Sequence, residues 1–171
     1  MKAVLISIRP KWCELIASGE KTIEVRKSKP NLETPFKVYI YMTAGDASYP
    51  VTINGAPYTC HNNGGMDVIG EFVCNKVEEF AANCKTAHLI HTEQIARSAC
   101  IPMCDLVEYG FRVPSLYGWH ISDLKIYPYG KSLREFSKVG FDEIVPLRRP
   151  PQSWMYVEEI SQMENGGARC D

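Results

Sequence analysis

Charged residues of both signs are concentrated in one short segment near the start of the chain. The segment SGEKTIEVRKSKP spans residues 18–30. It contains Lys21, Glu24 and Arg26, which together occupy a stretch of six residues. A carboxylate between two cations can hold them in place, and prepositioned lysine and arginine side chains bind a phosphate or a polarised carbonyl group. A lysine beside a glutamate can also transfer protons when burial shifts its pKa. The same spacing fits a structural ion-pair network that anchors a helix, so the residue types leave these interpretations open.

The elements before this segment determine where its side chains lie. Residues 2–8 (KAVLISI) predict a strand, and Pro10 suits the first position of a helix. Gly19 is placed to end that helix. Its apolar face is expected to be formed by Trp12, Leu15 and Ile16. The sequence therefore predicts a strand, a helix and a turn directly before Lys21.

The segment TIEVR (22–26) changes to the period-two pattern of a strand. Ile23 and Val25 point to one side, whereas Glu24 and Arg26 point to the other. The charged pair is thus expected on one face of a strand whose opposite face is apolar.

The bulk composition indicates one globular domain. The chain has 171 residues, of which 45% are apolar, and this is enough for one core. No apolar run approaches the ~20 residues that a membrane span needs, and the amino-terminal MKAVLISIRP does not have the features of a signal peptide. Seven cysteines without a secretion signal are typical of reduced thiols, so we expect a cytoplasmic protein that does not enter a membrane.

The net charge of −1 conceals an uneven distribution. Residues 1–37 carry eight Lys or Arg against four Glu, whereas residues 46–111 carry eight Asp or Glu against three cations. A basic patch of this kind suits phosphate-bearing partners. Chance clustering of surface charge explains so modest an excess equally well, so charge alone does not decide the function.

The rest of the chain contains more predicted strands than helices. One or two short helices are expected within 84–110, and another short helix at 131–138. An Asn-Gly pair in the polar segment 44–66 predicts a small hairpin. Further strands are expected at 37–43, 68–77, 117–128 and 153–160. No regular βαβ repeat is present, so the pattern predicts an α+β fold, a small mixed β-barrel with short flanking helices.

Four residues of the opening segment resemble the signature of a known family. The pattern Gly-x-Lys-x-x-Glu-x-Arg is similar to that of ASCH domains, which belong to the PUA-like superfamily. Three later segments, VIGEFVC, YGWHISDLKIYPYGKSLREF and RRPPQSWMYVEE, resemble ASCH proteins common in phages and prophages. The residues that carry the signature are Gly19, Lys21, Glu24 and Arg26. The resemblance implies one ASCH domain over residues 1–160. The Asn-Gly pattern adds the expectation of a hairpin insert at 44–66, and a flexible tail is expected at 161–171.

The resemblance also implies a PUA-like pseudobarrel whose signature residues line a cleft. Family members bind RNA or other nucleic acid, and some are enzymes. One bacterial branch hydrolyses acetylcytidine with a lysine, a threonine and a glutamate. Lys21 corresponds to that lysine and Glu24 occupies the threonine position, while Glu71 supplies the glutamate only if its position aligns. A carboxylate does not replace a hydroxyl nucleophile, so the sequence favours a binding protein over this amidohydrolase.

The first functional hypothesis is therefore binding of RNA, other nucleic acid or a nucleotide in this cleft. A hydrolase acting on a modified nucleoside or on RNA is the alternative, with Lys21 and Glu24 as an acid/base pair and Glu71 as a helper. A second alternative is a protein-interaction module in which the barrel is only a scaffold. The oligomeric state stays open.

Two later segments add candidate contacts. Aromatic side chains can stack nucleobases, but Trp119 and His120 alternate across their strand, so only one can face the cleft. A core position is favoured for Trp119. In PPQSW the prolines fix an extended backbone and two polar side chains suit a base edge, although a barrel-closing segment fits as well. The predicted nucleic-acid-binding residues are Lys21, Glu24, Arg26, Lys27, Tyr117, Trp119, His120, Gln152 and Ser153.

Cysteine and histidine residues gather in the middle of the chain. Four nitrogen or sulfur ligands can close a tetrahedral zinc site. The pattern here has no Cys-x-x-Cys pair, and Pro102 interrupts its second half, so we expect neither a metal nor a cofactor. The residues concerned are Cys84, His88, His91, Cys100 and Cys104.

Overall fold

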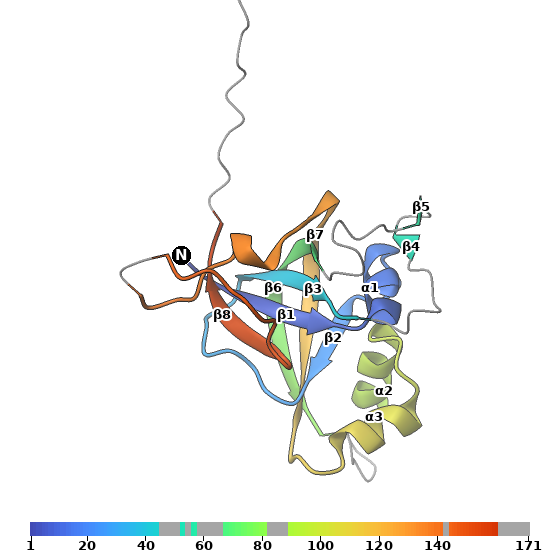
Figure 1. The fold of residues 1–171 in the computed structure, drawn as a ribbon. Coiled ribbons are helices and arrows are strands. Elements are labelled where there is room, and N and C mark those ends of the chain that lie inside the picture. The colour runs from blue at the N-terminus through green and yellow to red at the C-terminus, as the bar shows by residue number, and fades with distance from the viewer. Residues whose placement is uncertain (45–51, 54–55, 58–66, 82–88, 142–143, 161–171) are drawn as a thin grey trace, which may run out of the picture.

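Most of the chain forms one mixed sheet. The computed structural model describes residues 1–44, 52–53, 56–57, 67–81, 89–141 and 144–160. The six strands of the sheet are β1 (Lys2–Ile8), β2 (Ile23–Arg26), β3 (Phe36–Met42), β6 (Val68–Phe80), β7 (Leu116–Lys131) and β8 (Trp154–Glu158). They lie in the order β2-β7-β6-β3-β1-β8 (Figure 1).

The sheet combines one parallel pair with antiparallel neighbours. β1 and β3 run parallel, and the other adjacent pairs of the sheet are antiparallel. A parallel pair needs a crossover connection, and here the connection contains a helix and β2, which pairs at the far edge of the sheet. The α+β class and the mixed sheet predicted from the sequence are confirmed.

The helices gather at one side of the sheet (Figure 1). They are α1 (Pro10–Ala17), α2 (Leu89–Ser98) and α3 (Met103–Gly110). The short helices expected before Gly110 are therefore present as α2 and α3. The helix expected at 131–138 is only one 3₁₀ turn, η1 (Leu133–Glu135), and a capping box between Ser132 and Glu135 fixes it.

The first strand, β1, is buried on both faces, and this explains its continuous apolar sequence. Alternate side chains of β1 enter two separate core clusters on the two faces of the sheet. Val4, Ile6 and Ile8 pack in the cluster that includes residues of α1, while Ala3 and Leu5 pack in the cluster next to η1. A strand that is buried on both faces loses the apolar/polar alternation of a half-exposed strand.

The end of α1 sets the position of Lys21. Pro10 is the first residue of the helix, as the sequence predicts. Gly19 has φ +80°, a left-handed conformation that glycine adopts without steric cost. The backbone amide of Lys21 then donates to the carbonyl of Leu15 at 2.9 Å, so the chain turns directly from the helix into β2.

The buried face of α1 differs from the predicted one. Pro10, Cys13 and Ile16 are buried, whereas Trp12 and Leu15 are only half-buried. Helical periodicity identified the helix but placed its apolar face one residue away, and Trp12 packs partly buried between the core cluster and the cavity.

A hydrogen bond connects the two halves of the curled sheet. β2 is one edge strand, and β1 lies beside the opposite edge strand, β8. Even so, Arg26 Nη2 on β2 donates to the carbonyl of Ser7 on β1 at 2.7 Å. We call this the closing contact, because it joins β2 at one edge of the sheet to β1, which lies next to the other edge.

Parts of the predicted insert lie within the described residues. β4 (Thr52–Ile53) pairs with β5 (Ala56–Pro57) as an antiparallel ladder. Ile53 is buried and belongs to the core cluster that also includes residues of α1. Most of segment 44–66 and the whole of the tail 161–171 lie outside the described residues, so the division into domain, insert and tail stays a prediction.

Candidate functional site: a cationic cavity around β2

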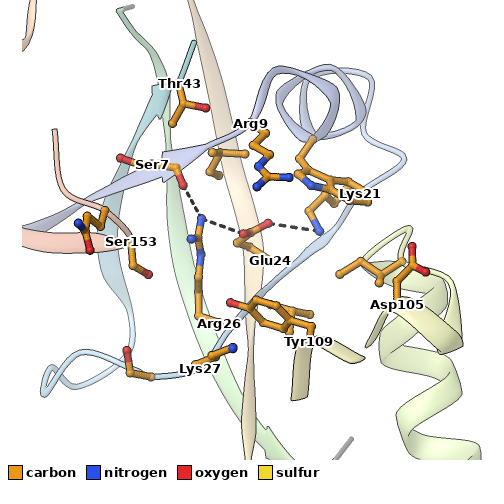
Figure 2. A pocket seen from close by; sticks show the side chains of 16 residues that line it. Ser7, Arg9, Lys21, Glu24, Arg26, Lys27, Thr43, Asp105, Tyr109 and Ser153 are labelled. Atoms are coloured by element: carbon orange, nitrogen blue, oxygen red, sulfur yellow. Dashed lines mark hydrogen bonds and ion pairs between the residues drawn. The ribbon is translucent and has the colours of Figure 1, made fainter. Parts of the chain in front are cut away.

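A cavity of about 760 Å³ lies where the end of β1, the start of α1, β2 and α3 meet. Its volume falls in the range of small-molecule and cofactor sites, roughly 300–1,000 Å³. The loop before β8 completes the wall opposite α3, as Figure 2 shows for Ser153 and Asp105. The cavity is therefore built from segments far apart in the chain.

Lys21, Glu24 and Arg26 form a connected ion-pair network in this cavity (Figure 2). Lys21 Nζ lies 3.2 Å from Glu24 Oε2, and Arg26 Nη2 lies 3.0 Å from Glu24 Oε1. Their side chains are 1%, 8% and 11% exposed in chain order. Glu24 thus bridges two cations in a site largely shielded from solvent, where electrostatic interactions are stronger than at the surface.

The network is also tied to three other elements. Lys21 Nζ donates to the carbonyl of Ala99 at 2.8 Å, and the Trp12 ring lies 5.0 Å from the same ammonium group. Arg26 makes the closing contact with Ser7. These bonds position β2 against α1, the end of α2 and β1. The structural role considered from the sequence is therefore present, and it occurs at the cavity itself.

One donor of the network has no acceptor. Among the described residues, Arg26 Nε is buried without a hydrogen-bond partner. An unpaired buried donor costs free energy of about 1–3 kcal/mol. The Arg26 side chain lines the cavity, but its Nε has almost no accessible surface, so a ligand oxygen would be a chemically suitable partner for it only after the side chain shifts.

The rim of the cavity carries further cations and an aromatic ring. Arg9 and Lys27 line the cavity and are exposed. Lys27 Nζ lies 4.7 Å from the centre of the Tyr109 ring. Burial raises the pKa of Tyr109, although the Arg26 guanidinium acts in the opposite direction. Tyr109 therefore stays a neutral phenol at physiological pH.

Six of the predicted site residues line this one cavity. Figure 2 shows that Lys27 and Ser153 lie on different sides of the central network. The carbonyl of Ser153 accepts a hydrogen bond from the backbone amide of Ser7 at 2.9 Å, which holds the loop against β1. The residues brought together are Lys21, Glu24, Arg26, Lys27, Gln152 and Ser153.

The aromatic candidates of β7 do not line the cavity. Trp119 is fully buried and its ring packs edge-on against Phe36 and Trp154. It is a core residue and is not accessible to a nucleobase. Tyr117 packs partly buried against the same cluster, and His120 Nε2 lies 3.2 Å from a carboxylate oxygen of Glu78.

Glu71 is separated from the signature network. It accepts a hydrogen bond from the Tyr127 hydroxyl at 2.5 Å, and Lys37 Nζ lies 3.8 Å from its other oxygen. Tyr127 belongs to the core cluster next to η1, and Glu71 does not line the cavity. In this structure Glu71 is therefore not placed to assist Lys21.

Sequence reasoning missed part of the cavity. Arg9 and Trp12 line the cavity and could have been predicted from the sequence, because they lie at the strand-to-helix junction that precedes the signature. No local sequence pattern could have predicted Asp105 and Tyr109, because α3 reaches the cavity only through the tertiary arrangement of the helices. Ile101 from the α2–α3 connection also lines the cavity.

Two features are absent from the described residues. No helix in the described ranges is both long and apolar enough to cross a lipid bilayer. Among the same residues, no group of three or more His, Cys, Asp or Glu side chains is arranged to hold a metal ion. Cys84 and His88 of the cysteine-histidine cluster lie outside the described residues, so the absence of a metal stays a prediction.

The curled mixed sheet and the helices beside it define an α+β domain of the PUA-like type. A family model described as the ASCH domain matches residues 6–96, which is more than half of the chain. The chain therefore belongs to the ASCH domain family. The matched range includes the signature network, whereas α3 and the loop before β8 lie beyond it. A comparison with curated proteins found no match.

Solved structures support the same fold. The chain is similar to an ASCH protein from Zymomonas mobilis, with a TM-score of 0.62 and 18% identity over 92% of this chain and 88% of that one. Two variants of that protein match equally well: one with tyrosine replaced by phenylalanine and one with serine replaced by alanine. Both have 18% identity and a TM-score of 0.62. The match to the tyrosine variant covers 93% of this chain and 92% of that one. The match to the serine variant covers 92% of this chain and 89% of that one. At this identity the similarity shows the fold alone.

Proposed function

We propose that this protein binds RNA, or a nucleotide of the same chemistry, in the cavity around β2. The observation that carries the proposal is the charge of the cavity lining, where four cations face two carboxylates. The cations are Arg9, Lys21, Arg26 and Lys27, and the carboxylates are Glu24 and Asp105. A net positive concave site attracts phosphate-bearing ligands.

Polar and aromatic groups of the lining support the same ligand class. Gln152 and Ser153 supply donors and acceptors of the kind that a base edge requires, and Tyr109 offers an aromatic ring. Single-stranded nucleic acid is commonly bound by basic grooves that also contain aromatic side chains. RNA binding and a cytoplasmic location stay proposals, as does the likeness to phage and prophage proteins.

A second candidate is a hydrolase acting on a modified nucleoside or on RNA. The observation that favours it is the 3.2 Å contact between Lys21 and Glu24 inside a cavity, which suits proton transfer. Glu71 takes no part in this version, because it lies elsewhere. Turnover of acetylated nucleosides or cleavage of RNA by the purified protein would distinguish this candidate from simple binding.

The test of the binding proposal uses fluorescently labelled single-stranded hexaribonucleotides of mixed sequence. We expect saturable binding that weakens steeply between 50 and 200 mM salt, because phosphate contacts release counterions. Lys27→Glu should reduce affinity at least tenfold. The matched control is Lys125→Glu, which changes an exposed lysine that does not line the cavity.

Two results would contradict the proposal. The first is the absence of measurable binding of any ribonucleotide probe by the folded protein. The second is an equal effect of Lys27→Glu and Lys125→Glu, which would assign the binding to general surface charge. Binding of a protein partner with little salt dependence would favour the scaffold alternative.

A further inference from the structure

The buried cations of the network are already occupied. Lys21 Nζ has the carbonyl of Ala99 and the carboxylate of Glu24 as partners. Arg26 Nη2 has the carbonyl of Ser7 and the same carboxylate. A phosphate placed against them would approach Glu24 in a poorly solvated site, where like charges repel strongly. The network is therefore a poor phosphate subsite.

The rim cations have the opposite properties. Arg9 and Lys27 are exposed, and within the described part of the chain neither has a carboxylate within 4 Å. Figure 2 shows them on opposite sides of the Glu24 carboxylate. Arg9 precedes α1 and Lys27 follows β2, so two different elements position them at the two sides of the cavity.

The interior suits a neutral ligand group that carries oxygen. Arg26 Nε is a buried donor without an acceptor among the described residues. Nε itself has almost no accessible surface, so a nucleobase carbonyl would accept from it only after a small shift of the Arg26 side chain, and it would do so without bringing a full negative charge beside Glu24. Gln152 and Ser153 on the neighbouring wall can pair with further polar atoms of a base edge.

We propose that the ligand is a single-stranded nucleotide whose unpaired base enters the cavity, while Arg9 and Lys27 hold its flanking phosphates at the rim. This inference rests on the proposed function and specifies how the same cavity recognises its ligand. It differs from the sequence-based hypothesis, in which the signature cations themselves bind phosphate. A duplex would first have to flip a base out of its stack, at a cost in free energy, so the proposal favours a single strand over duplex RNA.

The first test separates rim contacts from interior contacts by their salt dependence. Affinity for a labelled hexauridylate is measured at five salt concentrations. Arg9→Gln and Lys27→Gln should each lower the slope of log affinity against log salt by about 0.7, the value for one phosphate contact on a single strand. Arg26→Gln should weaken binding about tenfold or more and leave that slope unchanged. The matched controls are Arg97→Gln and Lys125→Gln, both exposed and outside the cavity lining.

The second test asks whether a base enters the cavity. A set of hexanucleotides is prepared, each with one central position made abasic. One of these probes should bind at least tenfold more weakly than the intact hexanucleotide, and its salt slope should be unchanged. Thermal melting of each variant checks that it is folded, and Arg26→Lys provides a second, charge-conserving variant that alters the Nε donor.

Each outcome decides between the proposals. If wild-type protein binds none of the probes, both the proposed function and this inference are wrong. If it binds with a salt-dependent affinity, but abasic probes bind equally well or only Arg26→Gln lowers the slope, the proposed function stands and this inference is overturned. A slope lowered by Arg9→Gln and Lys27→Gln, together with one sensitive abasic position, supports it.

Discussion

The ammonium group of Lys21 donates a hydrogen bond to the carbonyl of Ala99 at 2.8 Å, although 78 residues separate them in the chain. Ala99 directly follows α2, and Lys21 lies two residues before the start of β2. One side chain therefore joins the signature segment to the helices that form a wall of the cavity. Its contribution to stability can be measured separately from ligand binding.

Lys21→Met should destabilise the fold strongly. Methionine keeps an unbranched chain of similar length but leaves the Ala99 carbonyl and one oxygen of Glu24 without the ammonium group. Removing one member of a buried ion pair costs about 3–5 kcal/mol. Urea unfolding measures this loss, and Lys27→Met on the exposed rim serves as the control. Equal, small losses in the two variants would contradict the structural role of Lys21.

Glu24→Gln keeps the shape of the side chain and removes its charge. Two buried cations then lose their shared counter-ion, so we expect a loss of stability of about 3 kcal/mol. Oligonucleotide affinity should be retained or increased, because a negative charge leaves the cavity. If the protein is a hydrolase, turnover should fall ~100-fold or more while binding survives. Weaker binding at unchanged stability would show that Glu24 contacts the ligand directly.

Ile53→Ala should destabilise the protein although the residue lies in the predicted insert. Its side chain is 6% exposed in the core cluster that includes residues of α1. Truncating a buried isoleucine to alanine typically costs about 2–5 kcal/mol. Thermal or urea unfolding tests this, with Ile144→Ala as the control because Ile144 is exposed. A loss no larger than that of the control would mean that segment 52–57 is dispensable for the core.

The described cysteines should differ sharply in reactivity. Burial raises the pKa of Cys74 to about 12 and raises the pKa of Cys13 as well. The thiolate is the reactive form, so both should resist iodoacetamide at pH 8. Cys104 is exposed and should be modified readily. Mass spectrometry of labelled peptides reads the result, with urea-unfolded protein as the positive control. Rapid labelling of Cys13 in the native protein would contradict its burial.

Glu78 should make stability depend on acid pH. Burial opposes its ionisation, but a hydrogen bond from Lys76 and the nearby His120 ring outweigh burial and lower the pKa of Glu78 below 4.5. A carboxylate with a lowered pKa stabilises the fold above its unfolded-state pKa, and this contribution disappears as the pH falls through the folded-state value. The free energy of unfolding should therefore fall below about pH 5 in the wild type, and less steeply in Glu78→Gln.

Urea unfolding at several pH values between 3 and 7 measures this dependence. Glu79→Gln is the matched control, because Glu79 is the exposed neighbour on the same strand. Parallel pH curves for wild type and Glu78→Gln would contradict the stabilising role of the Glu78 contacts.

Local sequence patterns predicted the elements that hold the signature. Pro10 and Gly19 marked the two ends of α1, and the alternation in TIEVR placed Glu24 and Arg26 on one face of β2. Each of these inferences depends only on residues close in the chain. The signature then identified the family, which the comparison confirmed.

The composition of the cavity required the tertiary structure. Alternation along β7 could not show which of its faces packs in the core, so Trp119 stayed among the candidate binding residues although a core position was favoured for it, and the structure places it fully in the core. Tyr109 reaches the cavity only because α3 packs near β2. Glu71 lies on β6, but its partners, Tyr127 and Lys37, lie away from the signature network.

The closing contact has a consequence for the energetics of ligand binding. Arg26 and Ser7 belong to strands near opposite ends of the sheet order, and both line the cavity. Opening the curled sheet would therefore dismantle the cavity in the same step, and partly opened forms of the domain would have no affinity for ligand. By mass action, a ligand at 100 times its Kd would stabilise the closed form by about 2.7 kcal/mol. Occupancy of the cavity would thus slow hydrogen exchange at β1 and β2 together, because the bound ligand would stabilise both sides of the sheet against opening.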